Sequence, residues 1–330
     1  MKLSMLAVVA ALSAGTAGMA LSDELRIGMA APENTPWGTI THKFADKVAE
    51  LTGGELTVSV YFNNELGDEQ TMARQLARGR LDMAELSNVA SSLLVPEYGL
   101  LLSPYAFDSL KQADCVADGN LAETFGESFR SAGAVFLTPV EVGNMTIMSK
   151  TPIRTPSDLQ NVKIRTSPTQ SDTYFIQAAG GAAVPLGTAD SLPALKTGQV
   201  TALTTPIVIG VAGGYAAAAP QVTRTNHGHQ IGTILVSAQR WDGLSEENRA
   251  ALTEAAKVFV ELRPLMRETE EAMLKKVAES GGNVVEPTPD EMTQWKALAP
   301  EVRERMMADI GGNSVAIWDA IEAAKATCGQ

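Results

Sequence analysis

An arginine at the end of a short apolar stretch is the residue with the clearest potential for binding chemistry. The stretch NVKIRTSPT, residues 161–169, has the spacing of a short strand, and Arg165 ends it just before a Ser-Pro turn. Strand ends at turns are where α/β proteins place ligand-contacting groups. A buried guanidinium needs a partner there, and a carboxylate fits its planar fork. The residues alone leave two interpretations open: Arg165 binds an anionic ligand, or it is a solvated or salt-bridged strand end.

Other residue types that often carry chemistry form no recognisable site in the sequence. His227 and His229 are close together in TNHGH, but no further metal ligand is evident near them. The chain has no GxxxxGK[ST] phosphate loop, no GxGxxG after a strand, no GxSxG elbow and no HExxH motif. The sequence therefore predicts no catalytic residues, no metal and no cofactor.

The first twenty residues, MKLSMLAVVAALSAGTAGMA, are typical of a secretory signal peptide. One lysine precedes an apolar run, and small residues follow where cleavage occurs. The later apolar stretch at 207–219 is shorter than the roughly 18 residues that span a bilayer. No cysteine lies near the cleavage point to carry a lipid anchor. We therefore expect residues 1–20 to be a signal peptide and the remaining chain to be soluble in the periplasm.

The charge of the chain argues against a nucleic-acid partner. Removing Lys2 with the leader leaves 26 − 1 = 25 basic residues against 38 acidic residues, a net charge of −13. Affinity for nucleic acid comes largely from neutralising phosphates with Lys and Arg. A small anionic ligand stays compatible with this charge, because salt screens over about 8 Å and a buried arginine can dominate its own pocket.

Cys115 and Cys328 are the two cysteines of the chain. In an oxidising compartment such a pair is a possible disulfide, and closing so long a loop would stabilise the fold by about 4 kcal/mol. Two unpaired thiols are the alternative.

The order of elements predicts α/β architecture. Strand, helix and strand patterns follow one another from ELRIGMAAP to ELTVSVYF, which indicates a βαβ unit and a parallel sheet. A module of Leu-Gly, helix, Gly and returning strand occurs twice, at 66–86 and 186–205, and suggests two similar lobes.

Two long strand-like stretches, GAVFLTPVEVGNMTIMSK and IGTILVSAQ, would cross between these two lobes. A long helical pattern begins at the Ser245 cap and should kink or break at Pro264. Two lobes joined by crossing strands create a ligand cleft.

These pieces together resemble the solute-binding proteins of tripartite ATP-independent periplasmic (TRAP) transporters, dicarboxylate-binding type. The resemblance covers essentially the whole mature chain and rests on six segments in order: GGELTVSVYFNNELGDEQTMARQLARGRLDMA, LLSPYAFDSLKQA, TPIRTPSDLQNVKIRTSPT, DSLPALKTGQV, RTNHG and SAQRWDGLSEENRAAL. It implies a periplasmic-binding-protein-like fold of two α/β lobes, with crossing strands and a long helix spanning both. It also implies an organic acid ligand, delivery to a small and a large membrane subunit, and no catalysis.

The expected lobe boundaries follow from the crossing stretches. We expect residues 21–142 and about 235–270 to form lobe I, and residues 143–234 and about 271–330 to form lobe II. The protein is expected to be a monomer. An exported ligand-sensing module and a cleft enzyme of the same fold are the alternative functions.

The resemblance also assigns roles to particular residues. It implies that Arg165 pairs with the ligand carboxylate. Other positions depart from the family pattern, since Met145 stands where many members have a second arginine, Thr205 where an Asn is usual and Thr188 where an aromatic residue is common. Because these departures make the pocket less cationic, with Met145 as a soft apolar wall, we predict a monocarboxylate ligand. Lobe I is expected to contribute Glu85, Asn34 and Trp37.

Overall fold

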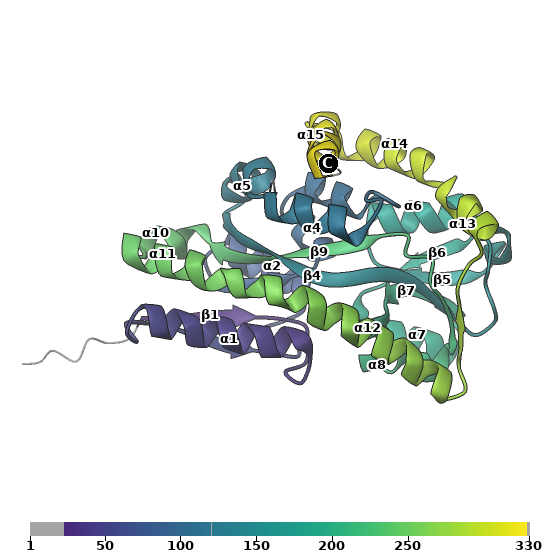
Figure 1. Cartoon of the computed structure of the whole chain (residues 1–330), viewed down its shortest axis with the longest axis horizontal. Coiled ribbons are helices and arrows are strands. Elements are labelled where there is room, and N and C mark those ends of the chain that lie inside the picture. Colours follow the sequence, from purple (N-terminus) through teal and green to yellow (C-terminus); the bar gives the residue numbers. More distant parts are fainter. Residues whose placement is uncertain (1–22, 120, 329–330) are drawn as a thin grey trace, which may run out of the picture.

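The computed structural model describes residues 23–119 and 121–328, and the predicted signal peptide lies outside the described residues. One twisted ten-stranded sheet in the order β2-β1-β3-β9-β4-β7-β5-β6 runs through the molecule, with β8 and β10 attached beside β4. Helices cover both halves of this sheet (Figure 1). The predicted α/β fold with two lobes and crossing strands is confirmed.

The first half of the sheet is the predicted βαβ unit with a third strand added. Strand β1 pairs in parallel with β2 on one side and β3 on the other. Helix α1 begins with Thr35 as N-cap and proline at its first position, and it buries Ile40, Phe44 and Val48. The elements of this half are β1 (Asp23–Gly28), α1 (Pro36–Leu51), β2 (Leu56–Tyr61), α2 (Glu69–Ala77), β3 (Met83–Leu86), α3 (Asn88–Ser91), η1 (Pro96–Leu102), α4 (Leu110–Gly119) and α5 (Leu121–Ser131).

The second half repeats this strand order, as the repeated module predicts. Here β5 lies between β6 and β7, all parallel, just as β1 lies between β2 and β3. Helix α7 ends at Gly198, whose φ of 76° is the left-handed conformation that glycine adopts without strain. The elements are η2 (Pro156–Leu159), β5 (Lys163–Thr166), α6 (Gln170–Ala178), β6 (Ala182–Pro185), α7 (Thr188–Thr197), β7 (Ala202–Pro206), α8 (Ile207–Ala212), α9 (Tyr215–Ala218) and β8 (Gln221–Thr223).

Two long antiparallel strands join the halves. β4 (Ala134–Ser149) and β9 (His229–Ser237) pair along most of their length, and β4 continues into the second half to pair with β7. The register of β4 shifts between Glu141 and Gly143, where Gly143 has a φ of 111°. This bulge interrupts the alternation of side chains at the point where the strand passes between the halves.

A long helix lies across both halves (Figure 1). The helical pattern after Ser245 divides into α11 (Glu246–Ala255), a 3-10 segment η3 (Ala256–Glu261) and α12 (Leu262–Glu279), so the predicted break falls just before Pro264. Glu270 of α12 accepts a hydrogen bond from the backbone N–H of Asn144 (3.0 Å), which fixes the helix to the bulge of β4. Short α10 (Ala238–Gly243) precedes this segment.

The C-terminal helices return to the first half of the sheet. After β10 (Asn283–Val285) come α13 (Pro289–Lys296), α14 (Ala299–Ile310) and α15 (Ser314–Cys328). Helix α15 packs against α4 and η1, and a disulfide joins Cys115 of α4 to Cys328. The last part of residues 271–330 thus lies against the N-terminal helices, and the lobe boundaries given above remain a prediction. Among the described helices, none combines the length and apolar character needed to cross a bilayer.

Candidate functional site

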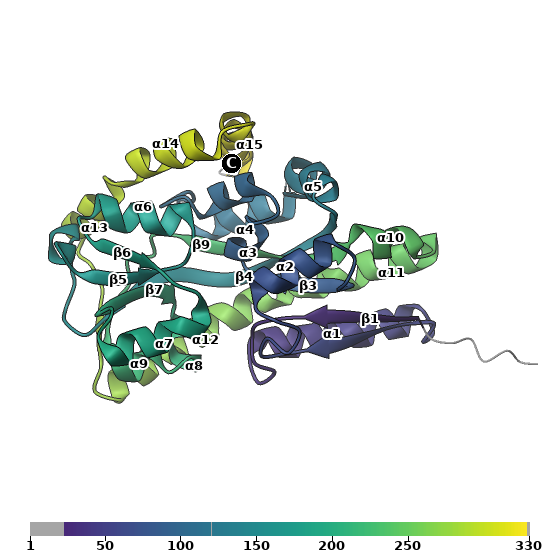
Figure 2. The ribbon, with the colours of Figure 1, turned by 180° about the vertical axis from the view of Figure 1, so that it is seen from behind.

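A cavity of about 260 Å³ lies where the two halves of the sheet face each other. We term it the Arg165 cavity. The second half contributes the ends of β5 and β7 and the start of α7, and the first half contributes the start of α2 and the turn after β3. Figure 2 labels these strands and helices. These are carboxyl ends of parallel strands and amino ends of helices, the edge of an α/β sheet where ligands bind.

Arg165 is built into the wall of this cavity. Its side chain is only 5% exposed, and two of its nitrogens are held by the protein: Nε donates to the carbonyl of Leu186 (2.9 Å) and Nη1 to the carbonyl of Thr204 (3.1 Å). Nη2 has no hydrogen-bond partner among the described residues. The guanidinium is therefore fixed in orientation, with donor capacity left for a ligand.

The charge of Arg165 is not paired within 4 Å by any carboxylate of the described residues. Burial lowers the pKa of the guanidinium from its ordinary value, and the nearby Asp172 carboxylate opposes that effect. Arginine stays protonated in proteins, so the cation persists. Asp172 instead accepts hydrogen bonds from the Ser167 backbone N–H (2.6 Å) and the Thr204 hydroxyl (2.5 Å), which hold the turn after β5. A buried cation without a close counter-ion favours an anionic ligand.

A second cavity of about 220 Å³ adjoins the first, and we term it the Trp37 cavity. Trp37, Glu85 and Val142 line it from the first half and the crossing strand. The two cavities have six lining residues in common, three from each half: Ala30, Glu69, Ser87, Thr188, Ile209 and Tyr215. They therefore form one continuous interlobe cleft.

The Trp37 cavity contains two carboxyl groups without a basic partner. Glu85 is 8% exposed, and its Oε2 accepts one long hydrogen bond from the Thr41 hydroxyl (3.4 Å). Glu69 accepts from the backbone N–H and hydroxyl of Ser87 (2.6 and 3.1 Å). Burial raises the pKa of Glu85 to about 8, and the Glu69 carboxylate adds to the rise. Burial also raises the pKa of Glu69, against the hydrogen bonds from Ser87.

The raised pKa of Glu85 predicts a distinctive pH dependence of stability. The folded protein keeps the Glu85 proton up to about pH 8, whereas the unfolded chain releases it above its ordinary pKa. The free energy of unfolding should therefore fall as pH rises from about 5 to 8, by roughly 4 kcal/mol from this group, and then level off. In the Glu85→Gln variant, this contribution to the decrease in the free energy of unfolding should be absent. Urea unfolding at a series of pH values measures it, with the exposed Glu127→Gln as control. Parallel curves for Glu85→Gln and the unaltered protein would contradict the prediction.

The structure brings five of the seven predicted ligand-binding residues to this cleft. Arg165, Thr205 and Thr188 line the Arg165 cavity, and Glu85, Trp37 and again Thr188 line the Trp37 cavity. Their roles in binding remain predictions.

Met145 and Asn34 line neither cavity. Met145 is 1% exposed, and its sulfur accepts a hydrogen bond from the Gln230 side chain (3.0 Å), while Gln230 itself lines the Arg165 cavity. The apolar wall predicted for Met145 is therefore not formed by that residue. Asn34 is exposed in the loop before α1.

Glu69, Tyr215 and Gln230 also line the cleft, although they are not among the predicted ligand-binding residues. Glu69 stands at the first position of a helix, where an acidic residue ordinarily stabilises the helix dipole. Tyr215 lies within the run IVIGVAGGYAAAA, where its isolation among small residues was the one available signal. Gln230 is the second residue of the buried strand β9, where a polar side chain is expected to have a hydrogen-bond partner.

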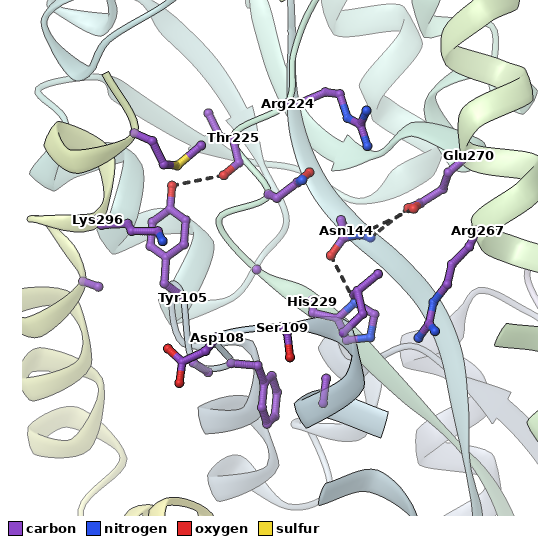
Figure 3. A pocket seen from close by; sticks show the side chains of 18 of the residues that line it. Tyr105, Asp108, Ser109, Asn144, Arg224, Thr225, His229, Arg267, Glu270 and Lys296 are labelled. Atoms are coloured by element: carbon purple, nitrogen blue, oxygen red, sulfur yellow. Dashed lines mark hydrogen bonds between the residues drawn. The ribbon is translucent and has the colours of Figure 1, made fainter. Parts of the chain in front are cut away.

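A larger polar cavity, of about 620 Å³, lies between α4, α12, α13 and the crossing strands, and Arg165 does not line it (Figure 3). Asn144 links Glu270 to His229 there (3.5 and 3.2 Å). Two of its arginines are paired with carboxylates, since Arg224 contacts Glu271 and Glu286 (2.8 and 2.9 Å) and Arg267 contacts Asp114 (2.6 Å). Arg303 and Lys296, which also line it, lie over the rings of Trp318 and Tyr105. The described residues also contain no cluster of three or more His, Cys, Asp or Glu arranged for a metal ion.

Comparisons with known proteins agree with this geometry. Residues 27–309 match bacterial extracellular solute-binding protein family 7. The 2,3-diketo-L-gulonate-binding periplasmic protein YiaO of Escherichia coli is 25% identical over 304 residues, 92% of each chain. The ectoine-binding periplasmic protein TeaA of Halomonas elongata is 26% identical over 332 residues, 98% of this chain and 96% of that one. A TRAP periplasmic solute-binding protein from Chromohalobacter salexigens with bound D-glucuronate has a TM-score of 0.86 at 25% identity, covering 91% of this chain and 99% of that chain.

A two-lobed fold whose interlobe cleft is lined by a buried arginine without a close carboxylate partner fits an extracellular protein that binds anionic solutes. The chain belongs to bacterial extracellular solute-binding protein family 7, the TRAP-type family. The predicted family and the predicted periplasmic location are confirmed by these relatives. Members of the family bind small organic ligands and work with membrane subunits of the transporter.

Proposed function

We propose that this protein captures a monocarboxylate in the interlobe cleft and delivers it to the membrane subunits of a TRAP transporter. The proposal rests on the absence of any second basic side chain beside Arg165 in the described lining of the cleft. Among the described residues, Arg165 is the only basic side chain lining either cavity of the cleft. Four acidic side chains line the same cleft: Asp68, Glu69, Glu85 and Asp190.

This charge distribution favours a ligand with one carboxylate over a ligand with two. The first carboxylate pairs with Arg165 and meets the start of α7, where Gly187 provides no side-chain cap for the free backbone N–H groups. A second carboxylate on the same ligand would lie near the acidic residues, and no described cation of the cleft would compensate it. Like charges in a buried site cost several kcal/mol.

The relatives are consistent with such a ligand. The named ligands of the three relatives above, 2,3-diketo-L-gulonate, ectoine and D-glucuronate, each carry one carboxylate. All three relatives align with nearly the whole chain. Their ligands have a polar or ring-shaped body, which a cleft of two adjoining cavities accommodates.

Titration calorimetry tests the proposal. The purified protein is titrated with a panel that pairs monocarboxylates with dicarboxylates of the same backbone, such as glucuronate with glucarate and butanoate derivatives with succinate. At least one monocarboxylate should bind with micromolar or lower Kd, and its dicarboxylate partner at least tenfold more weakly. A panel in which only dicarboxylates bind would refute the monocarboxylate assignment, and turnover of a bound ligand would favour the cleft enzyme.

A further inference from the structure

We infer that the Trp37 cavity binds a cationic group, so that the ligand is a zwitterion with its carboxylate on Arg165 and an organic cation between Glu69 and Glu85. This inference rests on the proposed function and narrows its ligand class. Quaternary ammonium and amidinium groups are the cations of suitable chemistry, because they carry a fixed charge on an apolar body.

The two carboxyl groups give the Trp37 cavity its polarity. No Lys, Arg or His of the described residues lies within 4 Å of either of them in an ion pair. Glu85 is buried with one of its oxygens, Oε1, unpartnered, although it lines the cavity. Glu69 is held in place by Ser87. Two acidic groups that interact with each other in a buried site are compensated when a cation lies between them.

Apart from Ser87 and Thr188, the remaining walls of the cavity are aromatic and apolar. Trp37 is fixed by a hydrogen bond from its indole Nε1 to the Glu141 carbonyl (2.9 Å), and Tyr215 by one from its hydroxyl to the Thr188 carbonyl (3.1 Å). Both side chains therefore donate their polar hydrogens to the protein, and the ring surface is the main feature that they offer to a cationic ligand. Aromatic rings attract organic cations through their π-electrons, and methylated ammonium groups are the established example.

Apolar side chains complete the lining and argue against a polyhydroxylated ligand body. The walls between the rings come from Ala30, Ala31, Pro32, Val142, Ile209 and Ala212. Hydroxyl groups of a sugar acid could bond to Glu69, Glu85 and the hydroxyls of Ser87 and Thr188, but a hydroxyl that faces the apolar walls would lack a partner, at a cost of about 1–3 kcal/mol. Methyl groups around a charged nitrogen satisfy both the walls and the carboxylates.

The test compares each cation with an uncharged molecule of the same shape. The purified protein is titrated with trimethylammonium carboxylates whose charges are separated by one, two or three methylene groups, and with their tert-butyl isosteres 3,3-dimethylbutanoate, 4,4-dimethylpentanoate and 5,5-dimethylhexanoate. Ectoine, glucuronate and galactonate complete the panel. At least one zwitterion should bind tenfold or more tightly than its neutral isostere and than both sugar acids.

A variant of the proposed cation subsite then identifies the residue responsible. Glu85→Gln keeps the shape of the side chain and removes its ability to become negative, so the preference for the cation should fall below threefold while the neutral isosteres bind as before. Glu127→Gln, exposed on α5, should leave the preference unchanged. Titrations of the zwitterion in buffers of different ionisation enthalpy should show proton release at pH 7 in the unaltered protein and none in Glu85→Gln.

The outcomes distinguish a failure of the cation subsite from a failure of the proposed function. If neutral acids or sugar acids bind as tightly as the zwitterions, and binding depends on Arg165, the cation subsite is refuted and the proposed function stands. If a cation is preferred equally by Glu85→Gln, the assignment of the subsite to Glu85 is refuted. If no carboxylate of the panel binds, the proposed function fails together with this inference.

Discussion

Replacing Arg165 with alanine should weaken ligand binding at least 100-fold while leaving the protein folded. The guanidinium supplies charge-assisted hydrogen bonds worth about 1.5–3 kcal/mol each, and every 1.4 kcal/mol corresponds to a factor of ten in Kd. The loss also leaves the ligand carboxylate in a cleft with four acidic side chains and no cation among the described lining residues. Titration calorimetry with the tightest monocarboxylate measures the change, and circular dichroism checks the fold.

Two matched variants make this prediction specific. Arg165→Lys keeps the charge, but an ammonium group cannot reproduce the planar fork held by the carbonyls of Leu186 and Thr204, so we expect an intermediate loss of roughly tenfold. Arg224→Ala removes an arginine of the large polar cavity, and binding should stay within threefold of the unaltered protein. If Arg224→Ala abolishes binding and Arg165→Ala does not, the ligand site lies in the large cavity.

Removing the disulfide should produce the largest loss of stability. The bond between Cys115 and Cys328 closes a loop with a sequence separation of 213, and the chain-entropy model gives a contribution of about 5 kcal/mol for so long a loop. The Cys115→Ser/Cys328→Ser variant should therefore unfold at a clearly lower urea concentration. Ligand affinity should be unchanged, since neither residue lines the cleft.

Chemical reduction provides the matched control for the disulfide. These two residues account for both cysteines of the chain. Treating the unaltered protein with reductant should therefore reproduce the unfolding midpoint of the double serine variant, and the same treatment should leave the variant unaffected. An equal midpoint for the oxidised protein and the variant would show that packing of α15 on α4, and not the covalent bond, holds the C-terminal segment.

The sequence was sufficient for the features that depend on local periodicity. The βαβ unit, the crossing strands β4 and β9 and the break before Pro264 all follow from alternation, helical spacing and proline stereochemistry. Arg165 could be selected because a charged residue at the end of an apolar strand is conspicuous. The repeated Leu-Gly to Gly module predicted the repeated strand order of the two halves.

Features that depend on strand register, or on which elements meet in the folded protein, could not be predicted from local sequence patterns. The β4 bulge between Glu141 and Gly143 shifts the alternation of side chains, so Val142 lines the cleft and Met145 packs behind Gln230. An unbroken strand pattern does not reveal such a shift. Glu69 enters the cleft only because α2 of one half faces the second half, and no local pattern contains that information.

The position of the ligand carboxylate in a crystal structure of the complex is the most direct test of the central claim. The ligand is the tightest monocarboxylate from the titration panel. We predict that a carboxylate oxygen lies within hydrogen-bond distance of Arg165 Nη2 and close to the backbone N–H groups at the start of α7. A carboxylate bound elsewhere, above all beside Arg224 and Lys296 in the large polar cavity, with Arg165 free of ligand contacts, would contradict the account.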